Sequence, residues 1–204
     1  MRKNVILILL FTISFSSCNN TKTANGKGDV EQNQIEKPLS DLSFYNLPSK
    51  WTNQNNKEVE LIDYRGKIIV VVMIYTSCKA SCPRLVSDMR DIESKVPKNL
   101  SKDVKYLLVS IDPDTDTPER LKAFSIENKM EEDQWVFLRG SSSDTREFAA
   151  VLAVNYKEIS PLDFSHSNII SVFNTDGELY YQKEGLGIDS NETINKIVEL
   201  GTKS

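Results

Sequence analysis

An apolar run that leads directly into a pair of cysteines places the strongest constraint on the fold of this chain. Residues 67–75 read KIIVVVMIY, and a run this rich in β-branched side chains predicts a strand buried on both faces. Cys78 and Cys82 follow at once, and residues 83–96 repeat apolar side chains at helical spacing. We therefore expect a buried strand that ends in a Cys-x3-Cys loop at the start of a helix.

The pattern downstream continues to alternate between strands and helices. Further strands are predicted at 104–111, 135–138, 169–174 and 178–183, and helices beginning at Thr117, at Ser143 or Asp144, and at about Ser190. Upstream, residues 44–47, 51–54 and 59–61 predict a short N-terminal β element. This order is typical of an α/β thioredoxin-like sandwich, with a central mixed sheet and flanking helices. In that fold the loop before the third core strand packs on the cysteine loop, and here that loop, residues 160–167, contains His166.

The first residues have the pattern of a targeting segment. Residues 1–17 combine a basic start, an apolar stretch too short to span a membrane comfortably, and small residues before Cys18. This resembles a bacterial lipoprotein signal peptide, which predicts lipidation of Cys18; the alternative is an ordinary signal peptide with an incidental cysteine. Residues 18–41 predict a flexible, lipid-anchored tether, and residues 42–204 a single domain. The expected location is extracytoplasmic, on the periplasmic side and anchored to the membrane.

Composition narrows the possible chemistry. The chain has one histidine, three cysteines and a net charge of −4, without a basic cluster, so we expect no nucleic-acid partner. Outside Cys18, the side chains that offer a thiolate or an imidazole are Cys78, Cys82 and His166. An extracytoplasmic location allows disulfides to form, which makes both metal binding and redox chemistry possible.

The spacing of these residues favours some kinds of site over others. Thioredoxin-type reductases use Cys-x2-Cys, a peroxidatic cysteine has a different upstream motif, and a structural zinc site prefers four ligands. The start of the helix is expected to lower the thiol pKa, most at the cysteine nearer to it. Two thiolates and one imidazole match Cu(I), or Cu(II) with an added oxygen ligand. The alternative is a structural disulfide between Cys78 and Cys82, with His166 a surface residue.

Three motifs occur in a fixed order, namely YTSCKASCP at 75–83, VSIDPDTDTPERL at 109–121 and FSHS at 164–167. With these motifs the chain resembles the Sco (SenC) family of copper-binding, thioredoxin-like proteins. The resemblance implies that Cys78, Cys82 and His166 are copper ligands. It also implies a role in assembling the dinuclear copper site of cytochrome c oxidase subunit II, by delivering copper or by reducing cysteines.

Several points stay open at this stage. A copper chaperone would turn over no substrate and would not be an enzyme, whereas a thiol–disulfide reductase would use Cys78 and Cys82 as a redox-active dithiol. A copper or redox sensor is a third possibility, and another copper enzyme, such as nitrous oxide reductase, is an alternative recipient. Asp112 is expected near the cysteine loop, where it would tune a thiol pKa or meet a partner; the alternative is that its motif serves as a rigid turn and helix cap. Asp163 is either a plain loop carboxylate or a carboxylate that orients the imidazole of His166.

Overall fold

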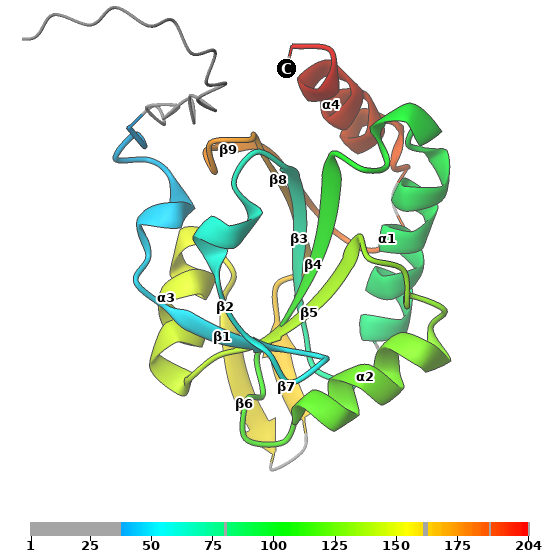
Figure 1. Ribbon diagram of the computed structural model, residues 1–204. Coiled ribbons are helices and arrows are strands. Elements are labelled where there is room, and N and C mark those ends of the chain that lie inside the picture. The colour runs from blue at the N-terminus through cyan, green and yellow to red at the C-terminus, as the bar shows by residue number, and fades with distance from the viewer. Residues whose placement is uncertain (1–37, 80, 161–162, 188, 204) are drawn as a thin grey trace, which may run out of the picture. The chain divides into compact units, whose positions relative to one another are not determined.

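A seven-stranded mixed sheet forms the centre of the domain in the computed structural model, which describes residues 38–79, 81–160, 163–187 and 189–203 (Figure 1). Its strand order is β2-β1-β5-β4-β3-β8-β9, and β6 and β7 form a separate two-stranded sheet. The strands are β1 (Lys50–Asn53), β2 (Glu58–Glu60), β3 (Ile68–Ile74), β4 (Val104–Ser110), β5 (Trp135–Arg139), β6 (Tyr156–Ser160), β7 (Asp163–His166), β8 (Ile169–Phe173) and β9 (Leu179–Glu184). The predicted thioredoxin-like sandwich is confirmed.

The strand before the cysteines lies where its sequence predicts. All seven residues of β3 are buried, because the strand pairs in parallel with β4 on one side and antiparallel with β8 on the other. Both faces of a strand in this position are covered by other layers, which its β-branched side chains suit. The end of β3 is thereby fixed at the centre of the domain.

Within the described residues, four α-helices cover the sheet: α1 (Cys82–Lys95), α2 (Pro118–Glu127), α3 (Ser142–Val151) and α4 (Asn191–Gly201). The α1 helix buries Leu85, Val86, Met89 and Ile92, the apolar positions expected from its helical periodicity. It lies next to α4 on one face of the sheet, while α3 covers the other (Figure 1). Thr117 caps α2 as predicted, since its hydroxyl accepts a hydrogen bond from the N–H of Arg120 at 3.3 Å. None of the helices in the described part of the chain is long and apolar enough to cross a membrane.

Three local predictions differ from the structure. Residues 44–46 form a 3-10 helix rather than a strand, since Ser43 caps this turn and Phe44 and Tyr45 pack into the core. The α3 helix is capped by Ser141, not by Ser143 or Asp144, because the Ser141 hydroxyl is the one that accepts from the backbone N–H of Asp144. His166 lies at the end of β7 rather than in a loop, and the whole β6–β7 hairpin was not predicted.

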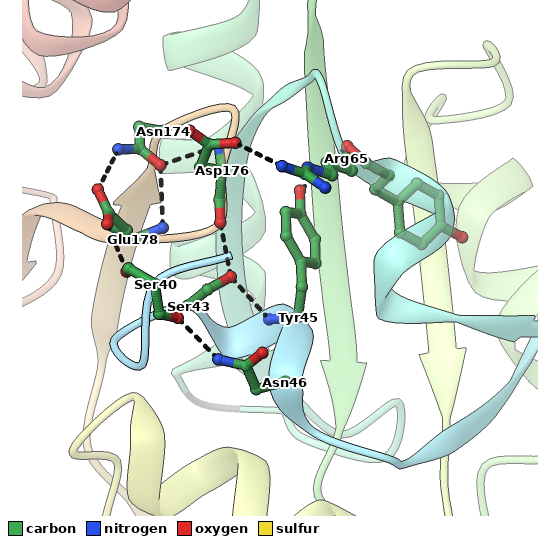
Figure 2. Close-up of polar contacts among 9 residues, drawn as sticks. Ser40, Ser43, Tyr45, Asn46, Arg65, Asn174, Asp176 and Glu178 are labelled. Atoms are coloured by element: carbon green, nitrogen blue, oxygen red, sulfur yellow. Dashed lines mark hydrogen bonds and ion pairs between the residues drawn. The ribbon is translucent and has the colours of Figure 1, made fainter. Parts of the chain in front are cut away.

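The first described residues are attached to the turn between β8 and β9. Figure 2 shows Ser40 bonded to the carboxylate of Glu178 and the Ser43 hydroxyl donating to the main-chain oxygen of Asp176. Arg65 forms an ion pair with the Asp176 carboxylate at 3.2 Å. Ser40, which the sequence assigns to the tether, is therefore in contact with the domain. The proposed signal segment and nearly all of the proposed tether lie outside the described residues.

Candidate metal centre

The two cysteines are held by the junction between β3 and α1. The backbone N–H of Cys78 donates to the carbonyl of Tyr75 at 3.2 Å, which closes a turn directly after the strand. Cys82 begins the helix, and its N–H donates to the sulfur of Cys78 at 3.3 Å. Cys82 is fully buried whereas Cys78 is partly exposed, and the two sulfur atoms are not joined in a disulfide. Cys78 is thus the more accessible of the two.

His166 completes the group. It is the last residue of β7 and lies at the open end of the β6–β7 hairpin, opposite the turn. Its Nε2 lies 3.8 Å from the sulfur of Cys82, and its Nδ1 lies 3.1 Å from the carbonyl oxygen of Ser167. A carbonyl only accepts hydrogen bonds, so Nδ1 carries the ring proton and Nε2 has its lone pair free for the thiol side. One donor atom from each of Cys78, Cys82 and His166 lies within 4.8 Å of the others.

Burial determines the protonation of these groups in the metal-free protein. Desolvation raises the pKa of the Cys82 thiol well above its usual range, although a main-chain hydrogen bond from Tyr75 opposes this. The expected lowering of the pKa at the cysteine nearer the helix is therefore wrong, since desolvation outweighs the helix terminus. Desolvation also lowers the pKa of His166. The imidazole is consequently neutral at pH 7, the form that can bind a metal ion.

The donor set fits a soft monovalent cation. Two sulfur atoms and one nitrogen suit Cu(I), which is satisfied by few, polarisable ligands. A structural zinc site prefers four ligands, and this group contains three. A buried thiol loses its proton readily only when a cation replaces it, so the raised pKa of Cys82 keeps this thiol protonated in the metal-free site.

A carboxylate that the sequence did not single out fastens the cysteine loop. Asp116 is fully buried, and its Oδ2 accepts from the N–H of Thr76 at 3.1 Å and from the hydroxyl of Ser110 at 2.6 Å. Desolvation raises its pKa, although these hydrogen bonds oppose the shift. Asp112 instead bonds within its own turn, where its Oδ1 accepts from the N–H of Thr115 at 3.3 Å. The last aspartate of the motif at 109–121, Asp116, is therefore the one that bonds to the cysteine loop. The clustering of acidic residues in the sequence did not indicate which aspartate would do so.

Asp163 does not bond to the imidazole. Its Oδ1 accepts a hydrogen bond from the hydroxyl of Tyr75 at 2.7 Å, while the ring of His166 is oriented by Ser167. Tyr75 is buried, and its ring lies edge-on to that of His166 at 5.8 Å between centroids. The sequence places Tyr75 at the end of the apolar run 67–75 and at the start of the motif 75–83, but it does not show what the tyrosine hydroxyl contacts.

Comparison with known proteins identifies relatives for most of the domain. The SCO1/SenC family model matches residues 43–200. The SCO1 protein homolog of Bacillus subtilis is 35% identical over 117 residues, which cover 57% of this chain and 58% of that protein. The aligned regions span 58% and 63% of the two curated relatives that match.

Solved structures share the fold. BsSco, described as a member of the Sco family of cytochrome c oxidase assembly proteins with a disulfide switch, has a TM-score of 0.68 at 26% identity, covering 82% of this chain and 100% of its own. Arabidopsis thaliana ScoI, solved with copper bound, has a TM-score of 0.68 at 18% identity, covering 78% and 99%. A SCO1/SenC family lipoprotein of Bacillus anthracis has a TM-score of 0.69 at 24% identity, covering 80% and 99%.

Proposed function

The chain belongs to the SCO1/SenC family, and from this premise we propose that it is an extracytoplasmic copper chaperone. Cys78, Cys82 and His166 would hold one copper ion as cargo. The observation that carries the proposal is the convergence of two thiols and one imidazole, with donor atoms within 4.8 Å of one another. The copper-bound structure of a relative with the same fold supports it.

The unequal exposure of the two thiols gives the transfer a direction. Cys78 is partly exposed and Cys82 is fully buried. A partner's thiolate or imidazole would therefore reach the metal from the Cys78 side, and Cys82 would be the last sulfur to release it. Binding would displace the proton of the Cys82 thiol, whose pKa is raised by burial, so copper affinity should rise with pH. His166 contributes no proton, because desolvation keeps the pKa of its imidazole low.

Titration of the reduced protein with Cu(I) and with Cu(II) tests this proposal. We expect one bound ion in the wild-type protein and no tight binding after Cys78→Ser or Cys82→Ser. In His166→Ala we expect the copper affinity to fall about tenfold or more, because even residues that only hydrogen-bond to a metal ligand have effects of this size. Ser165→Ala, an exposed neighbour on the same strand, is the matched control. Unchanged copper affinity in His166→Ala would refute the three-ligand site.

A thiol–disulfide reductase is the second candidate, and the pairing of one accessible thiol with one buried thiol favours it. Cys78 as thiolate would attack a partner disulfide and form a mixed disulfide, and Cys82 would then displace the partner. The partner gains two electrons and leaves as a dithiol, while this chain is left with a Cys78–Cys82 disulfide. His166→Ala separates the two functions, since a reductase keeps its activity without the imidazole. A copper or redox sensor, the third possibility, would require neither transfer of copper to a partner nor reduction of a partner disulfide.

The recipient we propose is the dinuclear copper site of cytochrome c oxidase subunit II. The description of BsSco as an oxidase assembly protein supports this choice. Mixing the copper-loaded chain with the metal-free copper domain of subunit II should move copper to the acceptor. The corresponding domain of nitrous oxide reductase is the comparison, and faster transfer to that domain would reassign the recipient.

Membrane attachment is proposed through a lipid on Cys18, after removal of residues 1–17. The SCO1/SenC lipoprotein of Bacillus anthracis supports this arrangement. Labelling of cells with a tagged fatty acid should modify the wild-type chain and not Cys18→Ser. Equal labelling of both proteins would exclude this site, and release of unmodified wild-type protein would support an ordinary signal peptide.

A further inference from the structure

The histidine half of the metal centre lies outside the main sheet. The β6–β7 hairpin pairs only with itself in the described structure, as a separate two-stranded sheet beside the seven-stranded one (Figure 1). Four of the five residues of β6 are exposed, and exposed and half-buried positions alternate along β7. Main-chain pairing with the central sheet does not hold this hairpin, so His166 is positioned by the short link from β7 to β8 and by side-chain contacts.

Tyr75 makes a concentrated set of such contacts. Its hydroxyl donates to Asp163 Oδ1 at 2.7 Å and accepts from the N–H of Phe164 at 3.3 Å. Its ring packs edge-on against the rings of Phe164, at 5.2 Å, and His166, at 5.8 Å. One side chain therefore touches the first, second and last residues of β7.

The same residue also belongs to the cysteine half. Tyr75 directly follows β3, and its carbonyl accepts the N–H of Cys78 that closes the cysteine turn. With 2% of its surface exposed, it is enclosed by the groups that it connects. Any movement of the hairpin away from β3 would break the hydroxyl contacts first, because they lie at the outer end of the side chain.

We propose that the hydrogen bond from Tyr75 to Asp163, here named the Tyr75–Asp163 tether, is a positioning device that holds His166 over the two thiols. This inference rests on the proposed copper site and adds residues that contact no metal. Without the tether, the hairpin would spend more time away from the cysteines. His166 would then be in position to bind copper for a smaller fraction of the time, whereas the two cysteines would stay in place. The tether therefore contributes to affinity by preorganising the imidazole.

The size of the effect follows from the type of bond. A hydrogen bond to a charged group contributes enough to change an equilibrium constant about tenfold or more. Because Asp163 is exposed, water competes for its carboxylate, and we expect the lower end of this range, about tenfold. Tyr75→Phe keeps the ring and its packing but removes every hydroxyl contact, those with Phe164 and Cys78 included. Asp163→Ala removes the tether and leaves these other contacts in place.

The test uses Tyr75→Phe, Asp163→Ala and the double variant, with Tyr156→Phe as the matched control. Tyr156 is also on the hairpin and packs near Phe164, at 6.5 Å between ring centroids, but its hydroxyl does not reach Asp163 or β3 in the described contacts. In the metal-free protein, hydrogen–deuterium exchange of the amides in β6 and β7 should be about tenfold faster in each tether variant. Exchange in β3 and β4 should be unchanged.

Copper binding provides the second measurement. Each tether variant should bind copper about tenfold more weakly, and the double variant should be no weaker than Tyr75→Phe, since that substitution already breaks the bond to Asp163. The nitrogen coupling of His166 in the Cu(II) electron paramagnetic resonance spectrum should weaken in the tether variants and persist in Tyr156→Phe.

The outcomes distinguish the tether from the proposed function. If Asp163→Ala has the copper affinity, the hairpin exchange rates and the nitrogen coupling of the wild-type protein, the tether is overturned. The proposed copper site is unaffected by that result. If the wild-type protein itself bound no copper, the proposed function would fail, and hairpin exchange in the metal-free variants would still decide whether the tether exists. Should Tyr75→Phe unfold, Asp163→Ala alone decides, because this side chain is exposed and contributes nothing to the core.

Discussion

The two halves of the metal centre are supported in different ways. Cys78 and Cys82 lie between a fully buried strand and a helix whose inner face is also buried. Asp116 fastens their loop by accepting a hydrogen bond from the N–H of Thr76. His166 lies on a hairpin with its own two-stranded sheet and largely exposed side chains. The cysteine half thus lies within the buried core, whereas the histidine half has few buried side chains, as is typical of segments that open locally.

Core packing should show the largest contrast between the halves. Leu85, on the helix behind Cys82, is fully buried, and Ile159, on the hairpin, is 60% exposed. We expect Leu85→Ala to lower the free energy of unfolding by about 3 kcal/mol or more, because it leaves a cavity. Ile159→Ala should change it by less than about 0.5 kcal/mol. Urea denaturation measures both, and comparable losses would mean that the hairpin is part of the cooperative core.

Removal of the buried carboxylate is expected to rank second. Asp116→Ala leaves the N–H of Thr76 and the hydroxyl of Ser110 without their acceptor, at a cost of about 2 kcal/mol of unfolding free energy. Asp114→Ala, exposed and two residues away in the same motif, serves as the control and should be close to neutral. Equal stability of the two variants, measured by urea denaturation, would show that Asp116 does not fasten the cysteine loop.

A smaller effect should appear in the pH dependence of stability. Desolvation lowers the pKa of His166 in the folded protein, so the unfolded chain binds the proton more readily. Stability is then fully present above the unfolded pKa of about 6.5 and decreases as the pH falls through it. Unfolding free energies of wild type and His166→Asn, measured from about pH 7.5 to about pH 5.5, should diverge in slope. Parallel curves would show that the imidazole is not desolvated at the site.

An exposed ion pair outside both halves should give the smallest effect. Lys50 and Glu58 pair at 2.9 Å across β1 and β2, with side-chain exposures of 61% and 67%. Water screens such a pair, so Lys50→Ala should change the unfolding free energy by less than about 0.5 kcal/mol and leave copper affinity as in the wild type. A larger loss would imply that the N-terminal β element supports the centre more than its contacts indicate.

Periodicity made much of the scaffold predictable. The runs that became β3, β4 and α1 are long and strongly patterned, because each buries its apolar side chains against the same core. The β6–β7 hairpin escaped prediction for the opposite reason. Its segment YKEIS has mostly polar side chains facing solvent, so neither face carries an apolar signal, and residues 44–46 were too few to distinguish a strand from a turn.

The sequence by itself determined the chemical identity of the site. Two thiols and the one histidine of the chain leave few alternatives for a soft metal ion, and the strand before Cys78 defined where the thiols lie. The tertiary structure decided what surrounds them: that Asp116 rather than Asp112 fastens the loop, that Asp163 binds Tyr75 rather than His166, and that burial outweighs the helix terminus at Cys82. These outcomes depend on distances between residues far apart in the chain and on the exclusion of water, which local sequence patterns do not encode.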